Sequence, residues 1–175
     1  MNVVLVMVSS VNGKITQGLD SDVTHWTSPE DASLFASLKE KYNLIVMGSK
    51  TYQAIRSKIQ LKKDTLRVVL TTHPEQFAAD KIEGQLEFTD ESPSKLIERL
   101  ELAGYTDMLL TGGSEINSLF IENGLVNELH ITIEPKLFGT GKNLLSESDL
   151  YTDMELMEIK RINDSGPLHL IYRVV

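Results

Sequence analysis

Two segments of the sequence join an apolar strand to a helix through glycine, an arrangement that can bind the phosphates of a nucleotide. Residues 108–124 read M-L-L-T-G-G-S-E-I-N-S-L-F-I-E-N-G, and residues 43–55 read N-L-I-V-M-G-S-K-T-Y-Q-A-I. Because glycine has no Cβ, a ligand can approach the backbone closely, and the first N–H groups of the following helix attract an anion. An ordinary strand-to-helix turn has the same residues, and neither segment is a G-x-G-x-x-G or P-loop motif. Two such turns in one short chain nevertheless favour a bound dinucleotide.

Polar side chains follow these glycines and can supply further contacts to a phosphate. Lys50 carries a positive charge between the hydroxyls of Ser49 and Thr51, although a solvated lysine is the simpler reading. Ser114 follows the glycine pair and is expected to cap the second helix. Both turns therefore predict anion sites at the ends of strands.

A third candidate for chemistry is the carboxylate of Asp31, in the segment H-W-T-S-P-E-D-A-S-L-F. A carboxylate there can hydrogen-bond an amino-pyrimidine ring. The same residues also form a capping box, with Ser28 as N-cap, Pro29 at the first helical position and Asp31 at the third. Asp31 can serve the cap, a ligand, or both.

The elements that must position these groups alternate between strand and helix. Continuous apolar runs, typical of strands covered on both faces, occur at residues 3–8, 44–47, 67–70 and 108–110. Helical patterns lie between them, at residues 29–42, 51–57, 94–103 and 114–123. We therefore predict an α/β fold with a mostly parallel central sheet. Beyond Val126 the pattern alternates, which predicts antiparallel strands at one edge, and residues 138–148 are expected to form a loop.

Composition excludes several classes of protein. The chain has 175 residues, most simply one domain over 1–175, and a formal net charge of −8, which argues against a nucleic-acid or anionic-membrane binder. There is no cysteine, and the four histidines lack metal-ligand spacing, so we predict no metal. No apolar run reaches the roughly 18 residues that span a bilayer. These features favour a cytoplasmic protein.

Four motifs in order resemble the dihydrofolate-reductase-like superfamily, and within it the reductase domain of bacterial riboflavin biosynthesis (RibD C-terminal-like). They are V-S-S-V-N-G-K-I-T, M-G-S-K-T-Y, L-R-V-V-L-T-T and G-L-V-N-E-L-H-I-T-I-E-P-K-L-F-G-T-G-K. The resemblance covers nearly the whole chain and implies a three-layer fold, helices on both faces of the sheet, antiparallel C-terminal edge strands, and NADPH as cofactor. The bifunctional enzyme also has a deaminase domain, whose zinc motif needs cysteine. Because this sequence has no cysteine, the resemblance implies a free-standing reductase.

Carried over position by position, the resemblance implies two sets of site residues. The cofactor set is Gly48, Ser49, Lys50, Thr51, Thr71, Thr72, Gly112, Gly113, Ser114, Glu115 and Ile116. Ser49 stands where many dihydrofolate reductases have an arginine, so a preference for NADPH over NADH rests on Lys50 and the hydroxyls.

On the substrate side, Asp31, Lys14 and Thr132 are the predicted catalytic residues, and Asn12, Trp26, Phe35 and Glu134 are the predicted substrate-binding residues. Each has a plainer reading, as a cap, a solvated lysine, a strand threonine or a packing anchor. Riboflavin reductases usually have an aspartate at Asn12, and an amide cannot act as an acid or base.

The resemblance implies an NADPH-dependent reductase acting on a phosphoribosylamino-pyrimidine, similar to 5-amino-6-(5-phosphoribosylamino)uracil reductase. The folate-binding arginine of dihydrofolate reductases falls at Thr65, whereas Arg67 fits the riboflavin pattern. Reduction of dihydrofolate, another pterin or a small carbonyl compound stays open, as does a non-catalytic nucleotide-binding protein of the same fold. Related reductases often pair through their C-terminal strands, which predicts a homodimer.

Overall fold

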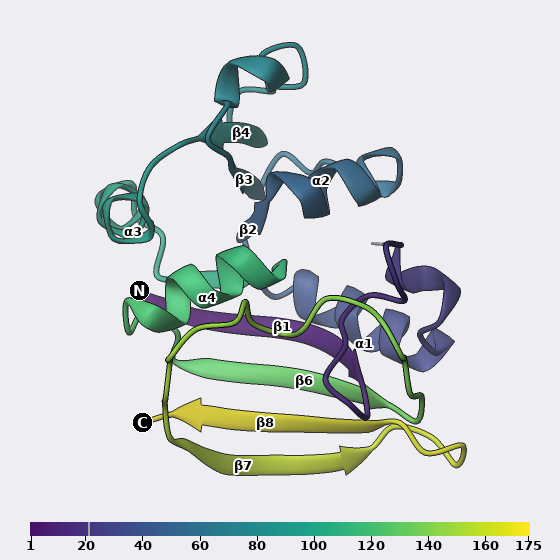
Figure 1. Cartoon of the computed structure of the whole chain (residues 1–175). Coiled ribbons are helices and arrows are strands. Elements are labelled where there is room, and N and C mark those ends of the chain that lie inside the picture. The colour runs from purple at the N-terminus through teal and green to yellow at the C-terminus, as the bar shows by residue number, and fades with distance from the viewer. Residues whose placement is uncertain (21) are drawn as a thin grey trace.

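The computed structural model describes residues 1–20 and 22–175, and its described strands form one sheet. The strands lie in the order β4-β3-β2-β5-β1-β6-β8-β7 (Figure 1). Their bounds are β1 (Asn2–Ser10), β2 (Leu44–Gly48), β3 (Leu66–Leu70), β4 (Leu86–Thr89), β5 (Asp107–Leu110), β6 (Glu128–Glu134), β7 (Met154–Arg161) and β8 (Leu168–Val174).

Strands β1 to β6 run parallel to one another, and β8 and β7 continue the sheet beyond β6 in antiparallel order. The predicted α/β class and the antiparallel C-terminal edge are confirmed. One part of that prediction is wrong, because β6 lies inside the sheet and pairs in parallel with β1. Its alternation suggested a half-solvated strand, yet the polar side chains of His130, Thr132 and Glu134 are buried.

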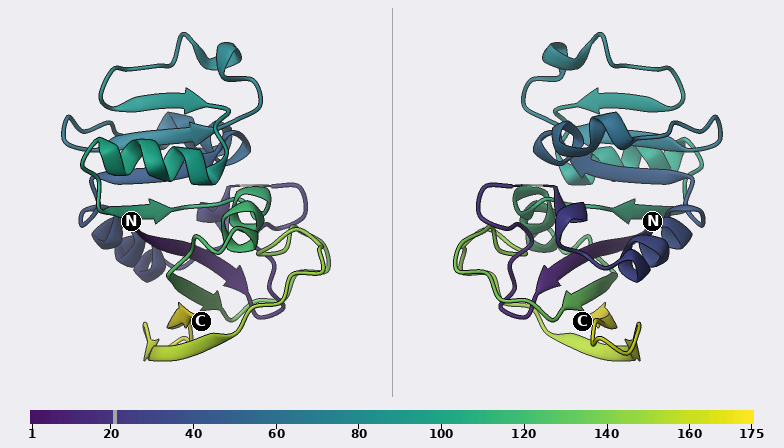
Figure 2. Two further views of the ribbon diagram at one scale, coloured as in Figure 1. Left: turned by 90° about the vertical axis from the view of Figure 1, so that its left-hand side faces the viewer. Right: turned by 90° about the vertical axis from the view of Figure 1, so that its right-hand side faces the viewer.

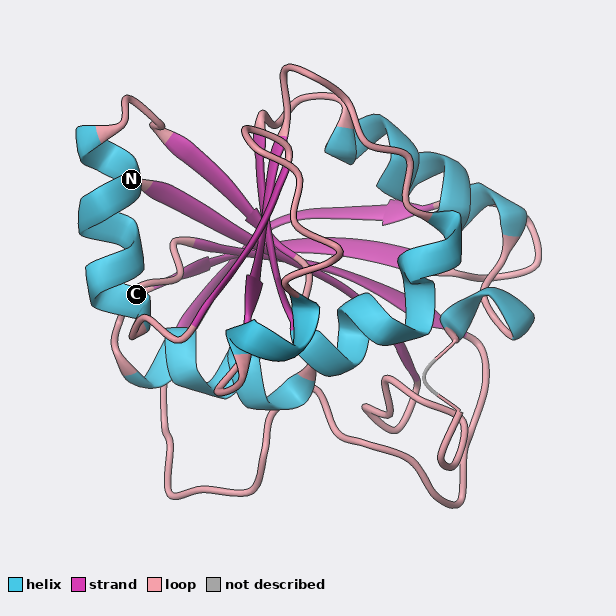
Figure 3. Ribbon diagram, turned by 90° about the horizontal axis from the view of Figure 1, so that it is seen from above, coloured by secondary structure: helices cyan, strands magenta, loops and turns pink. Residues whose placement is uncertain are grey.

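Helices cover both faces of the sheet, which confirms the three-layer prediction (Figures 2 and 3). The α-helices are α1 (Pro29–Lys39), α2 (Ser49–Ile55), α3 (Pro93–Leu102) and α4 (Ser114–Glu122), and the 3-10 turns are η1 (Val23–His25), η2 (Arg56–Lys58) and η3 (Pro74–Phe77). Leu96 and Leu100 of α3 and Phe120 of α4 belong to one buried cluster. Leu38 of α1 and Tyr52 of α2 belong to the cluster on the opposite face.

Element bounds differ from the prediction mainly at helix ends. Helix α1 ends at Lys39, three residues before Tyr42, and α2 begins at Ser49 because Gly48 already takes the N-cap position. The short strand β4 was not predicted, since two of its four residues, Glu87 and Thr89, are polar. It pairs with β3 at the edge of the sheet.

The parallel arrangement brings the carboxyl ends of six strands to one side of the sheet, where loops from distant parts of the chain meet. In α/β sheets this side is the usual place for a ligand. Within the described residues, none of the helices has the length and apolar character needed to cross a bilayer.

Candidate active site

A cavity of about 620 Å³ lies at the carboxyl ends of the parallel strands. Its wall includes residues at or just after the ends of several strands: Met7 (β1), Gly48 (β2), Leu70 (β3), Thr89 (β4), Thr111 (after β5) and Thr132 (β6). Its volume is in the range of ligand sites for small molecules and cofactors. The residues of this cavity fall into two ends of different chemistry.

At one end, helices α2 and α4 begin against the cavity directly after glycine. Gly48 and Gly113 are the N-cap residues, and neither helix has a side chain capping its first N–H groups. The expectation that Ser114 caps α4 is therefore wrong: Ser114 is the first helical residue, and its Oγ donates to the carbonyl of Asn143 at 2.5 Å. The uncapped N–H groups and the helix dipoles make this end suitable for an anion.

The two glycine turns are tied together and closely packed. The Gly48 N–H donates to the carbonyl of Gly112 at 2.8 Å, and the Gly112–Gly113 peptide bond is cis. A Cβ on Gly48 would lie 2.7 Å from Ile116 Cγ1, and one on Gly112, whose φ is +83°, would lie 2.8 Å from Met7 Sδ. Glycine is needed here because larger residues would push the two turns apart.

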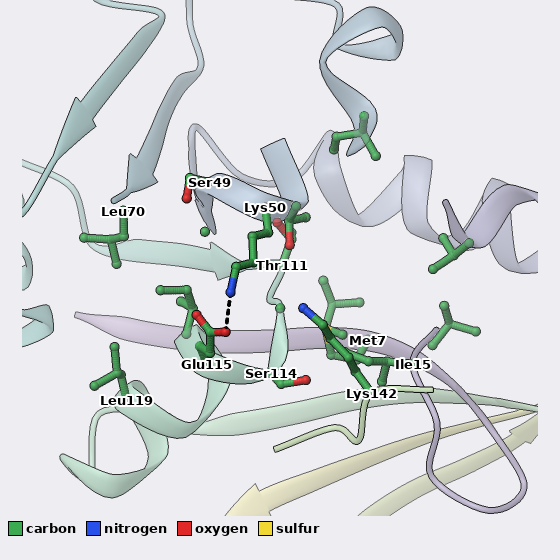
Figure 4. A pocket seen from close by; sticks show the side chains of 18 of the residues that line it. Met7, Ile15, Ser49, Lys50, Leu70, Thr111, Ser114, Glu115, Leu119 and Lys142 are labelled. Atoms are coloured by element: carbon green, nitrogen blue, oxygen red, sulfur yellow. Dashed lines mark hydrogen bonds and ion pairs between the residues drawn. The ribbon is translucent and has the colours of Figure 1, made fainter. Parts of the chain in front are cut away.

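Opposite charges meet at the mouth of this end. Lys50 Nζ donates to Glu115 Oε1 at 2.6 Å, and this hydrogen bond lowers the pKa of the Glu115 carboxyl. Both side chains are mostly exposed. In Figure 4 the pair lies on one side of Ser114, and Lys142 points its ammonium toward the same space from the other side. Lys50 and Lys142 are thus the two cations that line the described cavity.

The cavity continues along the ends of β3 and β4, where hydroxyls and carboxylates alternate. Thr71 and Thr72 follow β3 and line the wall together with Thr89 and Asp90. Glu91 also lines it, but Arg99 holds this carboxylate with a hydrogen bond of 3.0 Å, which lowers its pKa. Hydroxyls at this position can hydrogen-bond a ribose.

At the other end of the cavity, the structure separates the two predicted roles of Asp31. Ser28 Oγ accepts the Asp31 N–H at 3.2 Å, so the forward half of the capping box is present. The Ser28 N–H, which the Asp31 carboxylate would accept in a complete box, instead donates to Glu134 Oε1 at 2.7 Å. Glu134 thus completes the cap, and the Asp31 carboxyl is left to line the cavity.

Burial gives Asp31 an unusual acidity. The residue is only 8% exposed. This burial, with a smaller contribution from the negative charge of Glu134, raises the pKa of the Asp31 carboxyl to about 6, although the hydroxyl of Thr132 works in the opposite direction. The result is a carboxyl group that can gain or lose a proton near neutral pH.

Most residues of the predicted cofactor set line the cavity: Gly48, Ser49, Lys50, Thr51, Thr71, Thr72, Gly113, Ser114, Glu115 and Ile116. From the substrate side, Asp31, Phe35 and Thr132 line it too. Gly112 does not line the wall, but its carbonyl accepts the N–H of Gly48, which does.

Four residues predicted on the substrate side lie outside the cavity wall. The Asn12 side chain is hydrogen-bonded to both the N–H and the carbonyl of Phe138, and Lys14 Nζ donates to Asn143 Oδ1 at 2.7 Å. Trp26 is buried with its ring edge-on to Phe138, at 5.1 Å between centroids. Glu134 is engaged with Ser28. These contacts order the loops around the cavity, and direct roles for these residues stay predictions.

The polar cavity residues that were not predicted from the sequence include Thr16, Lys142 and His169. Lys142 lies in the loop 138–148, which closes on Thr16 where Gly141 passes so close that a Cβ would lie 2.1 Å from the Thr16 carbonyl oxygen. His169 lies directly opposite Thr132 in the β6–β8 register. The G-T-G-K run was the only signal for Lys142, and nothing in the sequence sets the register of His169. Among the described residues, no cluster of three or more His, Asp and Glu side chains could hold a metal ion.

A mostly parallel sheet between two helical layers, with a ligand-sized cavity across its strand ends, defines a dihydrofolate-reductase-like α/β protein. The sequence model of the RibD C-terminal domain matches residues 1–165, and the chain belongs to this family. The family suggests an oxidoreductase.

Solved structures have the same fold at low sequence identity. A putative riboflavin biosynthesis protein from Shewanella sp. PV-4 is 19% identical, with a TM-score of 0.81 over 100% of this chain and 99% of that one. The diaminohydroxyphosphoribosylaminopyrimidine deaminase/5-amino-6-(5-phosphoribosylamino)uracil reductase of Thermotoga maritima is 17% identical, with a TM-score of 0.76 over 99% of this chain but 56% of that one. Dihydrofolate reductase from Enterococcus faecalis, complexed with NADP(H), is 20% identical, with a TM-score of 0.64 over 99% and 96%.

Proposed function

We propose that this protein is an NADPH-dependent reductase that transfers hydride to a phosphoribosylamino-pyrimidine, as in riboflavin biosynthesis. One observation carries the proposal: a single cavity has two uncapped helix N-termini at one end and a buried, titratable carboxyl at the other. Phosphate binding suits the first end, and proton transfer to a substrate suits the second.

The residues at the glycine turns fit a dinucleotide. Gly48 and Gly113 would let the pyrophosphate approach the backbone, and the first N–H groups of α2 and α4 would donate to its oxygens. Lys142 and Lys50 would balance its charge, and Thr71 and Thr72 would contact the adenosine ribose and its 2′-phosphate. When bound, NADPH would supply the hydride.

Asp31 would supply the proton that accompanies the hydride. With a pKa near 6, roughly one molecule in ten still carries this proton at pH 7. Phe35, one turn further along α1, would pack against the planar ring of the substrate. Asn12 would act through the loop that it holds to Phe138, and not as an acid, because an amide cannot donate a proton in this way.

The substrate class is supported by relatives and by the absence of a folate contact. The Thermotoga maritima protein of the same fold is named as a reductase of a phosphoribosylamino-uracil. Arg67, the arginine nearest the folate register, is buried within the sheet and does not line the cavity. Lys14, in the loop after β1, is the candidate for holding the substrate phosphate.

A second candidate is the reduction of dihydrofolate or another pterin, or of a small carbonyl compound. A buried carboxyl one helical turn before an aromatic ring is suited to an amino-pyrimidine of either kind. The carboxyl geometry therefore favours a pyrimidine-like ring without choosing between the two substrates.

We also propose a homodimer that forms through the C-terminal edge of the sheet. Strand β7 exposes Met154, Leu156 and Ile159, which the register with β8 puts on one face. An edge strand with an apolar exposed face is a common pairing surface. Light scattering should give twice the chain mass for the wild type and the chain mass for Leu156→Lys; a monomeric wild type would contradict this.

A one-domain reductase of residues 1–175, without cysteine, would suit the cytoplasm.

The test of the proposed function is turnover. Purified protein with NADPH should oxidise it, measured at 340 nm, when 5-amino-6-(5-phosphoribosylamino)uracil is added, and not when dihydrofolate is added. Oxidation only by dihydrofolate would move the assignment to the second candidate. NADPH binding without oxidation by either substrate would indicate a nucleotide-binding protein that lacks the reductase chemistry.

A further inference from the structure

Three buried polar side chains from three elements line the end of the cavity that contains Asp31. Asp31 comes from α1, Thr132 from β6 and His169 from β8, and all three line the cavity although none is more than 8% exposed. Thr132 Oγ1 lies 3.3 Å from His169 Nδ1, and the Thr132 hydroxyl also lowers the pKa of the Asp31 carboxyl, as a nearby donor does. Thr132 thus joins the other two.

The register of the sheet makes this arrangement, and apolar packing does not explain it. Thr132 and His169 are directly opposed in the antiparallel pair of β6 and β8. The neighbours of His169 in sequence, Leu168 and Leu170, pack in the apolar cluster on the opposite face. Burying an imidazole costs free energy unless its nitrogens are hydrogen-bonded. Thr132 supplies one such partner, but the presence of a histidine at this buried position still needs a reason.

The hydroxyl of Thr132 has one hydrogen to donate. The protonation state of Asp31 therefore sets the direction of the hydrogen bonds from Asp31 through Thr132 to His169. When Asp31 is ionised, Thr132 donates to the carboxylate and accepts from the Nδ1–H of His169. When Asp31 is protonated, its own O–H can donate to Thr132, which then donates to an unprotonated His169 Nδ1. Both arrangements satisfy every group, and they differ by the position of one proton.

We propose that His169 is a positioning residue that returns a proton to Asp31 through the hydroxyl of Thr132. In this step the Nδ1–H bond of the imidazolium breaks as that proton bonds to Thr132 Oγ1. The original O–H bond of Thr132 breaks as its proton bonds to Asp31 Oδ. One positive charge leaves His169, one negative charge is neutralised on Asp31, Thr132 is unchanged, and no electrons are transferred.

The surrounding charges bring the two ends of the relay together in acidity. Burial raises the pKa of Asp31 and lowers that of His169, so the two values move toward each other. His130 on β6, whose ring centroid is 5.8 Å away, lowers the pKa of His169 further. From β7, Glu158 raises it and Lys160 lowers it, while Glu134 acts on Asp31. Proton transfer between groups of similar acidity is the least costly.

His130 packs beside His169 and contacts an acid near the surface. Its Nε2 lies 2.9 Å from Glu128 Oε2, and its Nδ1 is buried without a hydrogen-bond partner among the described residues. Glu128 is partly exposed. The second histidine therefore lies between His169 and an acid that contacts water.

The test of the relay needs neither cofactor nor substrate, so it can fail independently of the reductase assignment, on which only the catalytic use of the relay rests. Imidazole ¹⁵N and ¹H shifts of His169 are followed by NMR from pH 4 to 9 in the wild type, Asp31→Asn, Thr132→Val and Thr132→Ser. We expect two inflections in the wild type and in Thr132→Ser, which keeps the hydroxyl. The Asp31 inflection should vanish in Asp31→Asn and shrink strongly in Thr132→Val.

A His169 titration that is identical in all four proteins would overturn the relay. His73 serves as an internal control, because its side chain is exposed and does not line the cavity, and its titration should be the same throughout. If Thr132→Val fails to fold, the comparison of the wild type with Asp31→Asn still decides whether the two groups are coupled.

Turnover then tests the catalytic use. In His169→Asn, which keeps a side-chain N–H donor but cannot carry the proton, we expect kcat to fall at least about tenfold, with the affinity for NADPH unchanged. The fall should be largest toward low pH, where His169 of the wild type carries the proton, and should disappear at high pH, where its imidazole is neutral. His73→Asn should have no effect at any pH. An unchanged kcat in His169→Asn, with the NMR coupling present, would restrict His169 to fixing the Thr132 hydroxyl.

Discussion

The two ends of the cavity are built in opposite ways. The end at α2 and α4 consists of backbone: glycine turns, uncapped N–H groups and an exposed Lys50–Glu115 pair. The end at α1, β6 and β8 consists of buried side chains, among them Asp31 and Thr132, whose properties depend on their surroundings. A backbone site needs little more than local sequence, whereas a side-chain site depends on contacts between distant residues.

If the two ends have separate tasks, the largest effect should come from Asp31→Asn. Asparagine has the same shape but no titratable proton, so we expect turnover to fall about 100-fold or more, the usual contribution of an acid or base. Steady-state rates with NADPH and the pyrimidine measure this effect. Glu30→Gln, an exposed neighbour on the same helix, is the matched control and should leave the rate unchanged. A wild-type rate in Asp31→Asn would mean that Asp31 has only a structural role at the start of α1.

The same variant should change the pH dependence of stability. Because the folded-state pKa of Asp31, about 6, exceeds the ordinary value of 3.8, its protonated form stabilises the fold. This contribution is complete below pH 3.8 and is lost as the pH rises through 6, at a cost of about 3 kcal/mol.

Asp31→Asn should therefore gain stability over the wild type between pH 4 and 8, as measured by urea unfolding. The difference between the two proteins removes the contributions of all other titrating groups. A difference that stays constant with pH would show that the carboxyl has an ordinary acidity.

At the backbone end, Gly48→Ala should weaken dinucleotide binding about tenfold or more. The new Cβ would lie 2.7 Å from Ile116 Cγ1 and would push the start of α4 away from α2, and overpacking of this kind costs about 1–3 kcal/mol. Titration calorimetry with NADPH measures the loss. Adding Ile116→Ala should restore part of the affinity, with Ile116→Ala alone as the control. Unchanged NADPH affinity in Gly48→Ala would mean that the phosphates of the dinucleotide do not bind at this turn.

The smallest effect is expected from Glu115→Gln. The Glu115 carboxylate holds Lys50 and would repel a phosphate nearby, so its neutralisation should tighten NADPH binding about two- to fivefold. Glu122→Gln, at the far end of the same helix, is the control. Weaker binding in Glu115→Gln would mean that the lysine needs this partner to be held in place.

The same difference between the two ends decided what the sequence could predict. Strand, glycine and helix follow one another within a few residues in each turn, so both turns and the helices after them were predictable from residues 43–55 and 108–124. Even there, the cap position of Ser114 was wrong by one residue, because Gly113 itself can take the extended N-cap conformation.

The side-chain end could not be predicted to the same degree. Whether Asp31 completes the cap or faces the cavity depends on Glu134, which takes the Ser28 N–H from 106 residues away. His169 joins the site only through the pairing of β6 with β8. The alternation of polar residues in β6 suggested a solvated face, but Thr132 lines the cavity, Glu134 accepts the N–H of Ser28 at the start of α1, and His130 is buried.

The most direct test of this division of tasks is the affinity for NADPH, measured by nicotinamide fluorescence in the wild type, Gly48→Ala and Asp31→Asn. We predict saturable binding by the wild type, an equal affinity in Asp31→Asn and a large loss in Gly48→Ala. No saturable binding by the wild type, or an equal loss in both variants, would contradict the assignment of dinucleotide binding to the glycine turns.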